Sequence, residues 1–332
     1  MQKKKTKLKL WQILIALVLA VICLFLPGIM SSYMLRVMNI ALILYLCALS
    51  VYVLLGLCGQ NSFAQAGLWG IGAYTAGNVI MKFGGGSLTA LLISIVFTAV
   101  VSFLLGLIFF RLKNYYFTFA SIGLMTILNG LFMNWTSVTG GALGMSNIKT
   151  FSLLGFIADT EVKKYFVILI VCILATVVIV KLAKSALGRS FMAIRDNELA
   201  ANCLGINSLI TKSIAFAISG ALCGVAGYLY AFTSGYLSYQ TFTYAQSTML
   251  LIMVMLGGTA SPWGALIGTL SISLLQELVR PLQDYMQLIY GLGIVILMIY
   301  QPEGIWGGVS ELYDKFSTKR RKKDHTSAER AV

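Results

Sequence analysis

Residues 88–110 read LTALLISIVFTAVVSFLLGLIFF, a run that contains no charged side chain. As a helix rising about 1.5 Å per residue, such a run is long enough to cross the roughly 30 Å hydrocarbon core of a bilayer. Similar runs recur along the chain, which is 58% hydrophobic and 11% charged over 332 residues. Soluble domains carry about 25% charged residues. The composition therefore predicts a membrane protein with many spans.

The predicted fold is all-α, because lipid cannot satisfy free backbone groups and the runs are too uniformly apolar for barrel strands. We expect a polytopic protein with about ten transmembrane helices. Their approximate ranges are 10–30, 37–56, 66–82, 88–110, 115–134, 165–182, 212–233, 244–260, 263–280 and 285–301. The first is interpreted as an uncleaved span, because no small-residue cleavage site closes it. Residues 56–81 are rich enough in glycine to be broken or re-entrant.

Basic residues set the predicted orientation. Placing both termini in the cytoplasm puts most of the 25 Lys and Arg residues on the cytoplasmic side. The net charge of +14 therefore suits the positive-inside rule and anionic lipid, and it does not indicate a nucleic-acid partner. We divide the chain into a basic cytoplasmic N-terminus (1–9), a transmembrane domain (10–310) with a cytoplasmic loop (183–211), and a basic cytoplasmic tail (311–332).

Several kinds of chemistry are missing from the sequence. The one histidine, His325, lies in the basic tail, and the six cysteines form no CxxC pair. No acidic residue falls at the centre of a predicted span, which argues against a proton-driven carrier but less strongly against a sodium-driven one. No phosphate-binding GxxxxGK[ST] motif occurs. We expect no catalytic residue, metal or cofactor on this chain.

Residues 185–207, SALGRSFMAIRDNELAANCLGIN, form a charged stretch between two apolar runs. The pattern predicts a short helix from about Ser190 to Leu204, with Ser190 as its N-cap and Gly205 as a left-handed stop. Such a helix is too short and too polar to span a bilayer, so we expect it at the membrane surface. On periodicity alone it would be a solvated amphipathic connector.

Residues 59–77, GQNSFAQAGLWGIGAYTAG, combine five glycines with uncharged polar side chains. Such groups need partners inside a membrane, either in neighbouring helices or in a hydrated pathway. The density of polar groups favours a pathway lining over packing alone. The pathway residues predicted here are Asn61, Ser62, Gln65, Gly72, Tyr74 and Thr75. The pairs Gly220-x-x-x-Gly224 and Gly264-x-x-x-Gly268 are interpreted as close helix packing.

Five motifs, in this order, resemble those of the branched-chain amino acid ABC transporter permeases, of the larger, second-subunit type. They are GIGAYTAG (70–77), TGGALG (139–144), GRSFMAIRDNELAANCLGIN (188–207), MLGGTASPWGALIG (255–268) and YQPEGIWG (300–307). The resemblance runs from about residue 40 to 308. It departs from the family near Met125 and Thr126, where an acidic or amide residue is common and Asn129 is the next amide.

The resemblance implies a non-catalytic permease subunit in a bacterial plasma membrane. Its implied partners are a second permease, two cytoplasmic ATP-binding subunits that hold ATP and Mg, and an external solute-binding protein. The central helix would dock on an ATPase, with Phe191, Ile194 and Leu199 in an apolar groove and Arg195 and Glu198 pairing across its rim. The full set of implied coupling residues is Arg189, Phe191, Ile194, Arg195, Glu198, Ala201 and Gly205. Thr139, Gly140 and Gly141 would join residues 60–75 in lining or gating the path.

The cargo stays open at this level. Branched-chain amino acids are the family's commonest solutes, but related permeases carry urea or short amides, nucleosides or sugars. An ion-coupled secondary carrier acting alone is the alternative from another class. A docking helix argues against it, since a solitary carrier has no ATPase to dock.

Overall fold

The computed structural model describes residues 30–112, 114–148, 152–153, 156–157, 159–278 and 291. The long elements are α2 (Ser32–Val51) with the π-helix η1 (Tyr52–Leu57), α3 (Gln65–Met81), α4 (Ser87–Phe109), α5 (Asn114–Asn134), α7 (Glu161–Lys184), α10 (Ser208–Ser234), α11 (Tyr244–Gly257) and α12 (Pro262–Leu278). The shorter helices are α6 (Thr136–Thr139), η2 (Gly141–Leu143), α8 (Ala186–Asp196), α9 (Glu198–Cys203) and η3 (Tyr239–Thr241). Two small antiparallel ladders pair β1 (Met145–Ser146) with β4 (Tyr236–Leu237) and β2 (Ser152–Leu153) with β3 (Phe156–Ile157).

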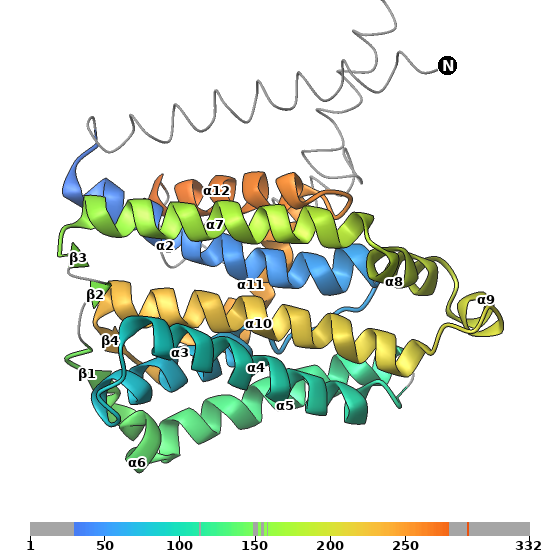
Figure 1. Cartoon of the computed structure of the whole chain (residues 1–332), viewed down its shortest axis with the longest axis horizontal. Helices are drawn as coiled ribbons and strands as arrows, with labels where there is room; N and C mark the ends of the chain where they lie inside the picture. The colour runs from blue at the N-terminus through green and yellow to red at the C-terminus, as the bar shows by residue number, and fades with distance from the viewer. Residues whose placement is uncertain are drawn as a thin grey trace, which may run out of the picture.

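The long helices lie side by side in one bundle (Figure 1). Helices α8 and α9 stand at one end, and α6 and the short strands stand at the other. We call these the α8–α9 end and the α6 end. Basic residues of the described chain divide between the ends as the charge pattern predicts, with Lys181, Lys184 and Lys212 at the α8–α9 end and Lys82 and Lys163 at the α6 end.

Five helical stretches of the described chain are long and apolar enough to cross a membrane: Ser32–Leu57, Ser87–Phe109, Tyr115–Asn134, Glu161–Lys184 and Ser208–Ser234. A sixth is possible if Tyr239–Gly257 and Pro262–Leu278, which meet at a bend of 117°, count as one broken span. The all-α polytopic prediction is confirmed. The predicted ten spans are not, since 10–30 and 285–301 lie outside the described residues.

Two of the predicted boundaries need correction. The spans expected at 244–260 and 263–280 are one sharply bent pair, because the helix stops after Gly257 where Gly258 adopts a positive φ of 110°. The expected span at 66–82 is α3, which has 17 residues and begins at Gln65. The suspected break in the glycine-rich segment is real, because residues 58–64 separate η1 from α3 without a helix.

Helices α3, α4 and α10 pack closely through small residues. The buried side chains of α4 recur at about every fourth position, as Ala90, Ser94, Thr98, Ser102 and Gly106. This spacing places them on one face of the helix, turned toward α10.

Gly224 marks the tightest point of this packing. Ser94 Oγ donates to the carbonyl oxygens of Gly72 and Gly224 at 2.8 and 2.9 Å, which joins α4 to both neighbouring helices. A Cβ atom on Gly224 would come within 2.7 Å of the Ser94 carbonyl oxygen. The packing interpretation of the Gly220/Gly224 pair is therefore confirmed.

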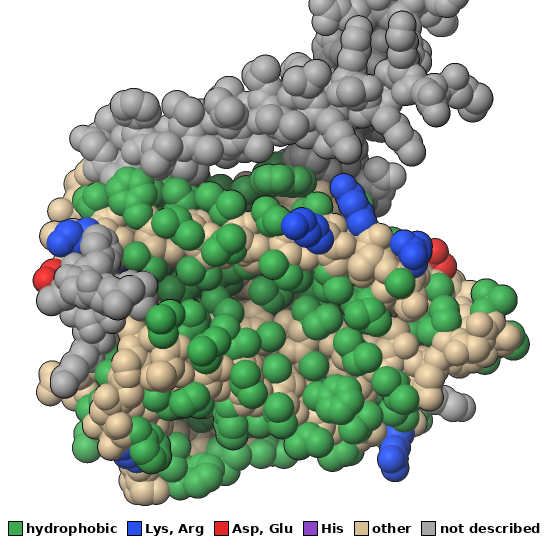
Figure 2. Space-filling model, in the orientation of Figure 1, with side chains coloured by type: hydrophobic (Ala, Val, Ile, Leu, Met, Phe, Trp, Pro, Cys, Tyr) green, Lys and Arg blue, Asp and Glu red, His purple; other side chains and the backbone are tan. Residues whose placement is uncertain are grey.

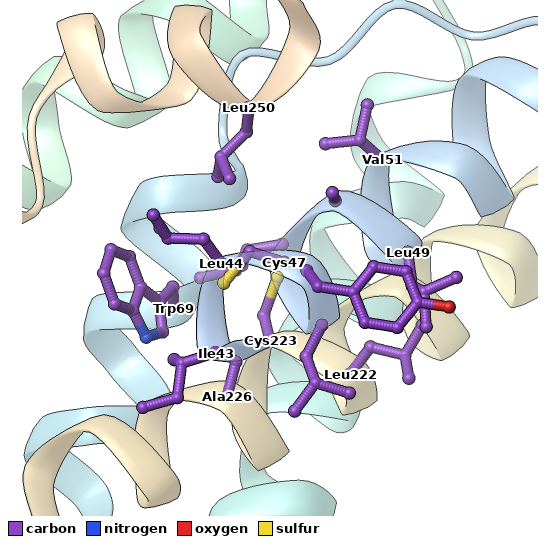
Figure 3. Close-up of a cluster of buried hydrophobic side chains, with 14 of the residues drawn as sticks. Ile43, Leu44, Cys47, Leu49, Val51, Trp69, Leu222, Cys223, Ala226 and Leu250 are labelled. Carbon is purple, nitrogen blue, oxygen red and sulfur yellow. The ribbon is translucent and has the colours of Figure 1, made fainter. Parts of the chain in front are cut away.

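The core centres on α2, which is buried along most of its length between α3, α7, α10 and α11. The side chains that meet in its middle include Ile43, Leu44, Cys47, Trp69, Leu222, Cys223, Ala226 and Leu250 (Figure 3). Four of the five described cysteines are buried and none is in a disulfide, so they act as small apolar side chains in this part of the chain.

Helices α4 and α7 turn apolar side chains outward. Leu92, Val96 and Val100 of α4 and Leu174 and Val178 of α7 are all exposed. Figure 2 shows hydrophobic side chains covering this face, with Lys and Arg near its two ends. Such a surface suits contact with lipid tails.

We expect Gly224→Ala to destabilise the bundle by about 1–3 kcal/mol, because the added methyl group overlaps the backbone of α4. Thermal unfolding of the detergent-solubilised chain measures this loss. Gly123→Ala on α5 is the matched control, since a Cβ atom there meets nothing within 4 Å. Equal stability of the two variants would contradict the packing assigned to Gly224.

Candidate functional site

Helix α3 begins in the interior of the bundle, and α11 begins beside it with its first residue, Tyr244, 45% exposed. The side chain of Gln65, the first residue of α3, donates through Nε2 to Ser219 Oγ at 2.9 Å, near the middle of α10. The start of α11 lies against the start of α3, with the rings of Phe63 and Tyr244 5.5 Å apart. Two helix N-termini therefore lie close together, one of them buried near the middle of α10.

The first N–H groups of a helix have no partner within the helix. Around the start of α3, serine hydroxyls accept these hydrogen bonds. Phe63 N–H donates to Ser121 Oγ of α5 at 3.0 Å, and Ala66 N–H donates to Ser247 Oγ of α11 at 3.0 Å. Ser62 Oγ accepts from the amide of Ala64 at 3.3 Å. Helices α5 and α11 are thus both bonded to the start of α3.

The polar residues predicted to line a pathway divide into two groups. Ser62 and Gln65 are buried and bond to each other, with Ser62 Oγ donating to Gln65 Oε1 at 3.2 Å. Gly72 lies against α10, where a Cβ atom would come within 2.7 Å of the Gly224 Cα atom. Within this chain, packing accounts for these three residues. Asn61 is exposed and Thr75 is half-buried, so these two remain accessible.

Tyr74 differs from both groups. Its ring is buried beside Phe132 and Phe242, and its hydroxyl group has no hydrogen-bond partner among the described residues. It therefore lies in an aromatic cluster and not on an accessible surface.

The Thr139-Gly140-Gly141 stretch is a tight turn at the α6 end. Thr139 Oγ1 donates to the Phe132 carbonyl oxygen at 2.7 Å and accepts from the Gly141 amide at 3.1 Å. Gly140 and Gly141 have φ angles of 76° and 61°, a conformation that disfavours side chains. A bulky residue at Gly141 would therefore strain this turn as well as any path beside it.

Asn129 was not among the predicted site residues. Its Nδ2 atom donates to the carbonyl oxygens of Tyr239 and Phe242 at 3.0 and 2.7 Å. These contacts hold the segment that leads from α10 into α11. The sequence does carry a signal for the two neighbouring helix starts. The pattern SFAQ at 62–65 recurs as TYAQ at 243–246, at the starts of α3 and α11.

The central loop forms two helices where one was predicted. Helix α8 begins after Ser185, whose Oγ accepts from the Gly188 amide, while Ser190 lies inside the helix. Asn197 then leaves helical geometry, with φ of −160°, and caps α9 by accepting from the Ala200 amide at 3.1 Å. The predicted left-handed stop at Gly205 is confirmed by its φ of 84°.

Helix α8 turns its apolar face into its own chain. Phe191 and Ile194 are buried there, and Ala201 of α9 is buried too. This chain itself covers Phe191 and Ile194, so a partner's groove would reach them only if α8 moved, and their predicted role in docking stays a prediction. Leu199 and Leu204 of α9 are 79% and 81% exposed and remain free to contact another protein.

The charged residues of the loop also bond inside the chain. Glu198 Oε2 lies 2.7 Å from Lys212 Nζ, and the Lys212 side chain is only 4% exposed. Burial raises the pKa of the nearby Cys58 thiol to about 12, so this thiol stays neutral at physiological pH. Arg195 Nη1 donates to the Gly56 carbonyl oxygen at 2.7 Å. The predicted pairing of Arg195 and Glu198 across a partner's rim is replaced by these two internal contacts.

The remaining two coupling residues lie on the loop surface. Arg189 is exposed and donates through Nη1 to the Lys184 carbonyl oxygen at 3.2 Å. Gly205 is also exposed, and a Cβ atom there would meet nothing within 4 Å. Glycine is therefore favoured at this position by the positive φ of 84° and not by a close contact.

The outward face of α5 mixes exposed apolar side chains, such as Phe119, Ile127 and Leu131, with polar and small residues. Thr126 and Asn134 are exposed, and Cβ atoms at Gly123 and Gly130 would meet nothing within 4 Å. Spacings of three, four and seven residues put Gly123, Thr126 and Gly130 on one face. This face lets another helix approach the α5 backbone closely.

A family described as branched-chain amino acid transport system / permease component matches residues 33–300. High-affinity branched-chain amino acid transport system permease protein LivM of Escherichia coli (strain K12) is 30% identical over 302 residues, which cover 84% of this chain and 71% of the relative. LivM of Salmonella typhimurium is 30% identical over 317 residues, covering 89% and 75%.

A more distant similarity is to autoinducer 2 import system permease protein LsrC of Salmonella paratyphi B. It is 26% identical over 264 residues, which cover 75% of this chain and 73% of the relative. No solved structure matches this chain significantly.

We expect Ser247→Ala to destabilise the chain by about 1–3 kcal/mol, because it leaves the Ala66 N–H group buried without an acceptor. Thermal unfolding in detergent measures the effect. Thr248→Ala is the control, since the Thr248 hydroxyl bonds only to the Tyr244 carbonyl oxygen of its own helix. Unfolding of Ser247→Ala at the temperature of the control would argue against the role assigned to Ser247.

Glu198→Ala leaves the Lys212 ammonium group buried without its partner, so we expect a loss of about 3 kcal/mol in stability. The double variant Glu198→Ala/Lys212→Met should recover most of that loss, because it removes the unpaired charge. Thermal unfolding of both variants is the measurement. If Glu198→Ala were as stable as the unaltered chain, the ion pair between Glu198 and Lys212 would make no contribution to stability.

Proposed function

This chain belongs to the family of branched-chain amino acid transport system permease components, and we propose that it forms part of the translocation pathway of an ATP-driven importer in a bacterial plasma membrane. The observation that carries the proposal is the family match over residues 33–300. The chain moves its solute and leaves it chemically unchanged. ATP and Mg are held by other subunits.

The proposed complex contains a second permease, two cytoplasmic ATP-binding subunits and an external solute-binding protein. The geometry of the α8–α9 end supports the ATPase contact. Leu199 and Leu204 of α9 are strongly exposed at the far tip of the bundle, where no lipid tail would cover them. Exposed leucines at such a position suit a contact with another protein. The α8–α9 end therefore faces the cytoplasm in this proposal, with the termini on the same side.

The outward face of α5 is the proposed contact with the second permease and the path between the two subunits. Thr126 and Asn134 are exposed on this face and bond to carbonyl oxygens of their own helix, so their polar groups suit either a helix contact or a hydrated path. The open backbone at Gly123 and Gly130 leaves room for a partner helix. Asn61, which is exposed in segment 58–64, is the more accessible of the two residues of the earlier pathway set that packing leaves open, the other being the half-buried Thr75.

Branched-chain amino acids are the proposed cargo, since two relatives that cover most of this chain are named for their transport. The likeness to an autoinducer 2 import permease supports a second candidate, another small polar solute carried by the same machinery. A neutral path with no described carboxylate at mid-span suits a zwitterion or an uncharged solute. Selection among such solutes would fall mainly to the binding protein.

Reconstitution tests the proposal. The chain is purified with the subunits that accompany it, placed in liposomes with its binding protein, and assayed for uptake of radiolabelled leucine, isoleucine, valine and autoinducer 2. We expect uptake of a branched-chain amino acid that requires ATP. Uptake driven by an ion gradient without ATP would replace the proposal with a secondary carrier, and ATP-driven uptake of autoinducer 2 alone would change the cargo.

In the same assay, Gly130→Phe should reduce uptake at least tenfold, because the ring fills the space left open on α5. Its own chain should still fold, since nothing lies within 4 Å of that position. Val96→Phe on the outward apolar face of α4 is the matched control and should keep its uptake. Normal uptake by Gly130→Phe would remove α5 from the pathway.

A further inference from the structure

The side chain of Arg195 connects the central loop to the interior of the bundle. Its Nη1 atom donates to the Gly56 carbonyl oxygen at 2.7 Å, and its Nη2 atom lies 3.2 Å from Asp196 Oδ1. We propose that Arg195 is a positioning residue that transmits movement of α8 to the non-helical segment 58–64, and through it to the start of α3. This inference rests on the proposed function, in which an ATPase moves the loop.

The contact is built into the backbone at Gly59. This glycine has a φ of 70°, and a Cβ atom there would come within 2.7 Å of Arg195 Cγ. The arginine stem therefore lies directly against the first part of segment 58–64. A side chain at position 59 would both strain the backbone and push Arg195 away from the Gly56 carbonyl group.

Gly56 lies at a junction of three elements. It is the second-last residue of the π-helix η1, which continues α2 and leads into segment 58–64. A Cβ atom on Gly56 would come within 2.6 Å of the Thr259 carbonyl oxygen, in the bend between α11 and α12. A cation is favourable at such a helix C-terminus, where carbonyl groups lack partners. Arg195 thus contacts the point where both interrupted parts of the bundle meet.

From Gly59 the chain leads to the interior site without another helix. Two backbone hydrogen bonds at its beginning are local, from Gly59 N–H to the Leu55 carbonyl oxygen and from Gln60 N–H to the Leu54 carbonyl oxygen. Phe63 N–H is then held by Ser121, and the Gln65 side chain by Ser219. A shift at Gly59 is therefore passed to the start of α3, which those serines hold against α5 and α10.

The second ion pair of the loop, between Glu198 and Lys212, connects different elements from those that Arg195 connects. Glu198 joins α9 to Lys212 of α10, a continuous helix. That pair fixes the loop to α10, and although it lies near Cys58 at the start of segment 58–64, the bond itself joins α9 to a continuous helix. The two contacts therefore make separable predictions, in which loss of the Glu198 pair lowers stability while loss of Arg195 breaks the link between loop and interior.

The experiment uses the whole complex in proteoliposomes with two readouts. The first is the number of solute molecules moved per ATP hydrolysed. The second is alkylation at an Asn61→Cys substitution, resolved by peptide mass spectrometry, with and without ATP. We expect Arg195→Ala to keep its ATPase subunits and its hydrolysis, to move at least tenfold fewer solutes per ATP, and to lose the ATP-dependent change in alkylation.

Two further variants keep the test decisive if Arg195→Ala folds poorly. Arg195→Lys retains a donor for the Gly56 carbonyl group and should recover part of the coupling. Gly59→Ala keeps Arg195 in the sequence but pushes its side chain away from the Gly56 carbonyl group. It should therefore show the same loss of solute movement per ATP as Arg195→Ala. Arg111→Ala, an exposed basic residue at the same end of the bundle, is the control and should behave as the unaltered complex.

Unchanged solute movement per ATP in both Arg195→Ala and Gly59→Ala would overturn the inference. Loss of the ATPase subunits from Arg195→Ala would also overturn it, because Arg195 would then be a docking residue. If the unaltered complex takes up no solute with ATP, it is the proposed function that fails.

Discussion

A helix that begins inside a membrane must find acceptors for its first N–H groups, because neither lipid nor water supplies them there. The start of α3 meets this constraint with neutral hydroxyl groups. Ser121 of α5 and Ser247 of α11 accept from its backbone, and Ser219 of α10 holds the side chain of Gln65. One helix start is therefore bonded to three other helices, and none of these described bonds uses a charged side chain.

Close contact among α3, α4 and α10 depends on the same arrangement. Once the start of α3 is fixed, Gly72 lies opposite Gly224 and Ser94 bonds to both backbones. Glycine and serine are small enough to let these helices approach closely. Large apolar side chains would not hold them together in the same way, because lipid tails are equally apolar. The polar, glycine-rich stretch that suggests a water-filled path is thus largely a packing surface within one chain. Accessible positions lie on α5 and at Asn61.

Sequence reasoning recovers the features that depend on local composition. Long apolar runs predict the membrane helices, and Gly205 correctly predicts the left-handed stop after the loop helix. It fails where a neighbour decides the outcome. The amphipathic pattern of α8 does not say whether Phe191 and Ile194 face this chain or another, and the structure buries both. Asn197 splits the loop helix because it caps α9, and the two spans predicted at 244–260 and 263–280 form a pair bent by 117°, an angle that hydropathy does not encode.

The hydrogen bond between Ala66 and Ser247 joins residues 181 positions apart in the chain. During synthesis α3 therefore emerges long before the acceptor that completes its first turn. Until α11 is translated and inserted, the start of α3 must be hydrated or held by the insertion machinery, since no lipid group can replace a serine hydroxyl. The first turn of α3 is therefore completed only after α11 has been synthesised, so the final packing of an early helix depends on a late one.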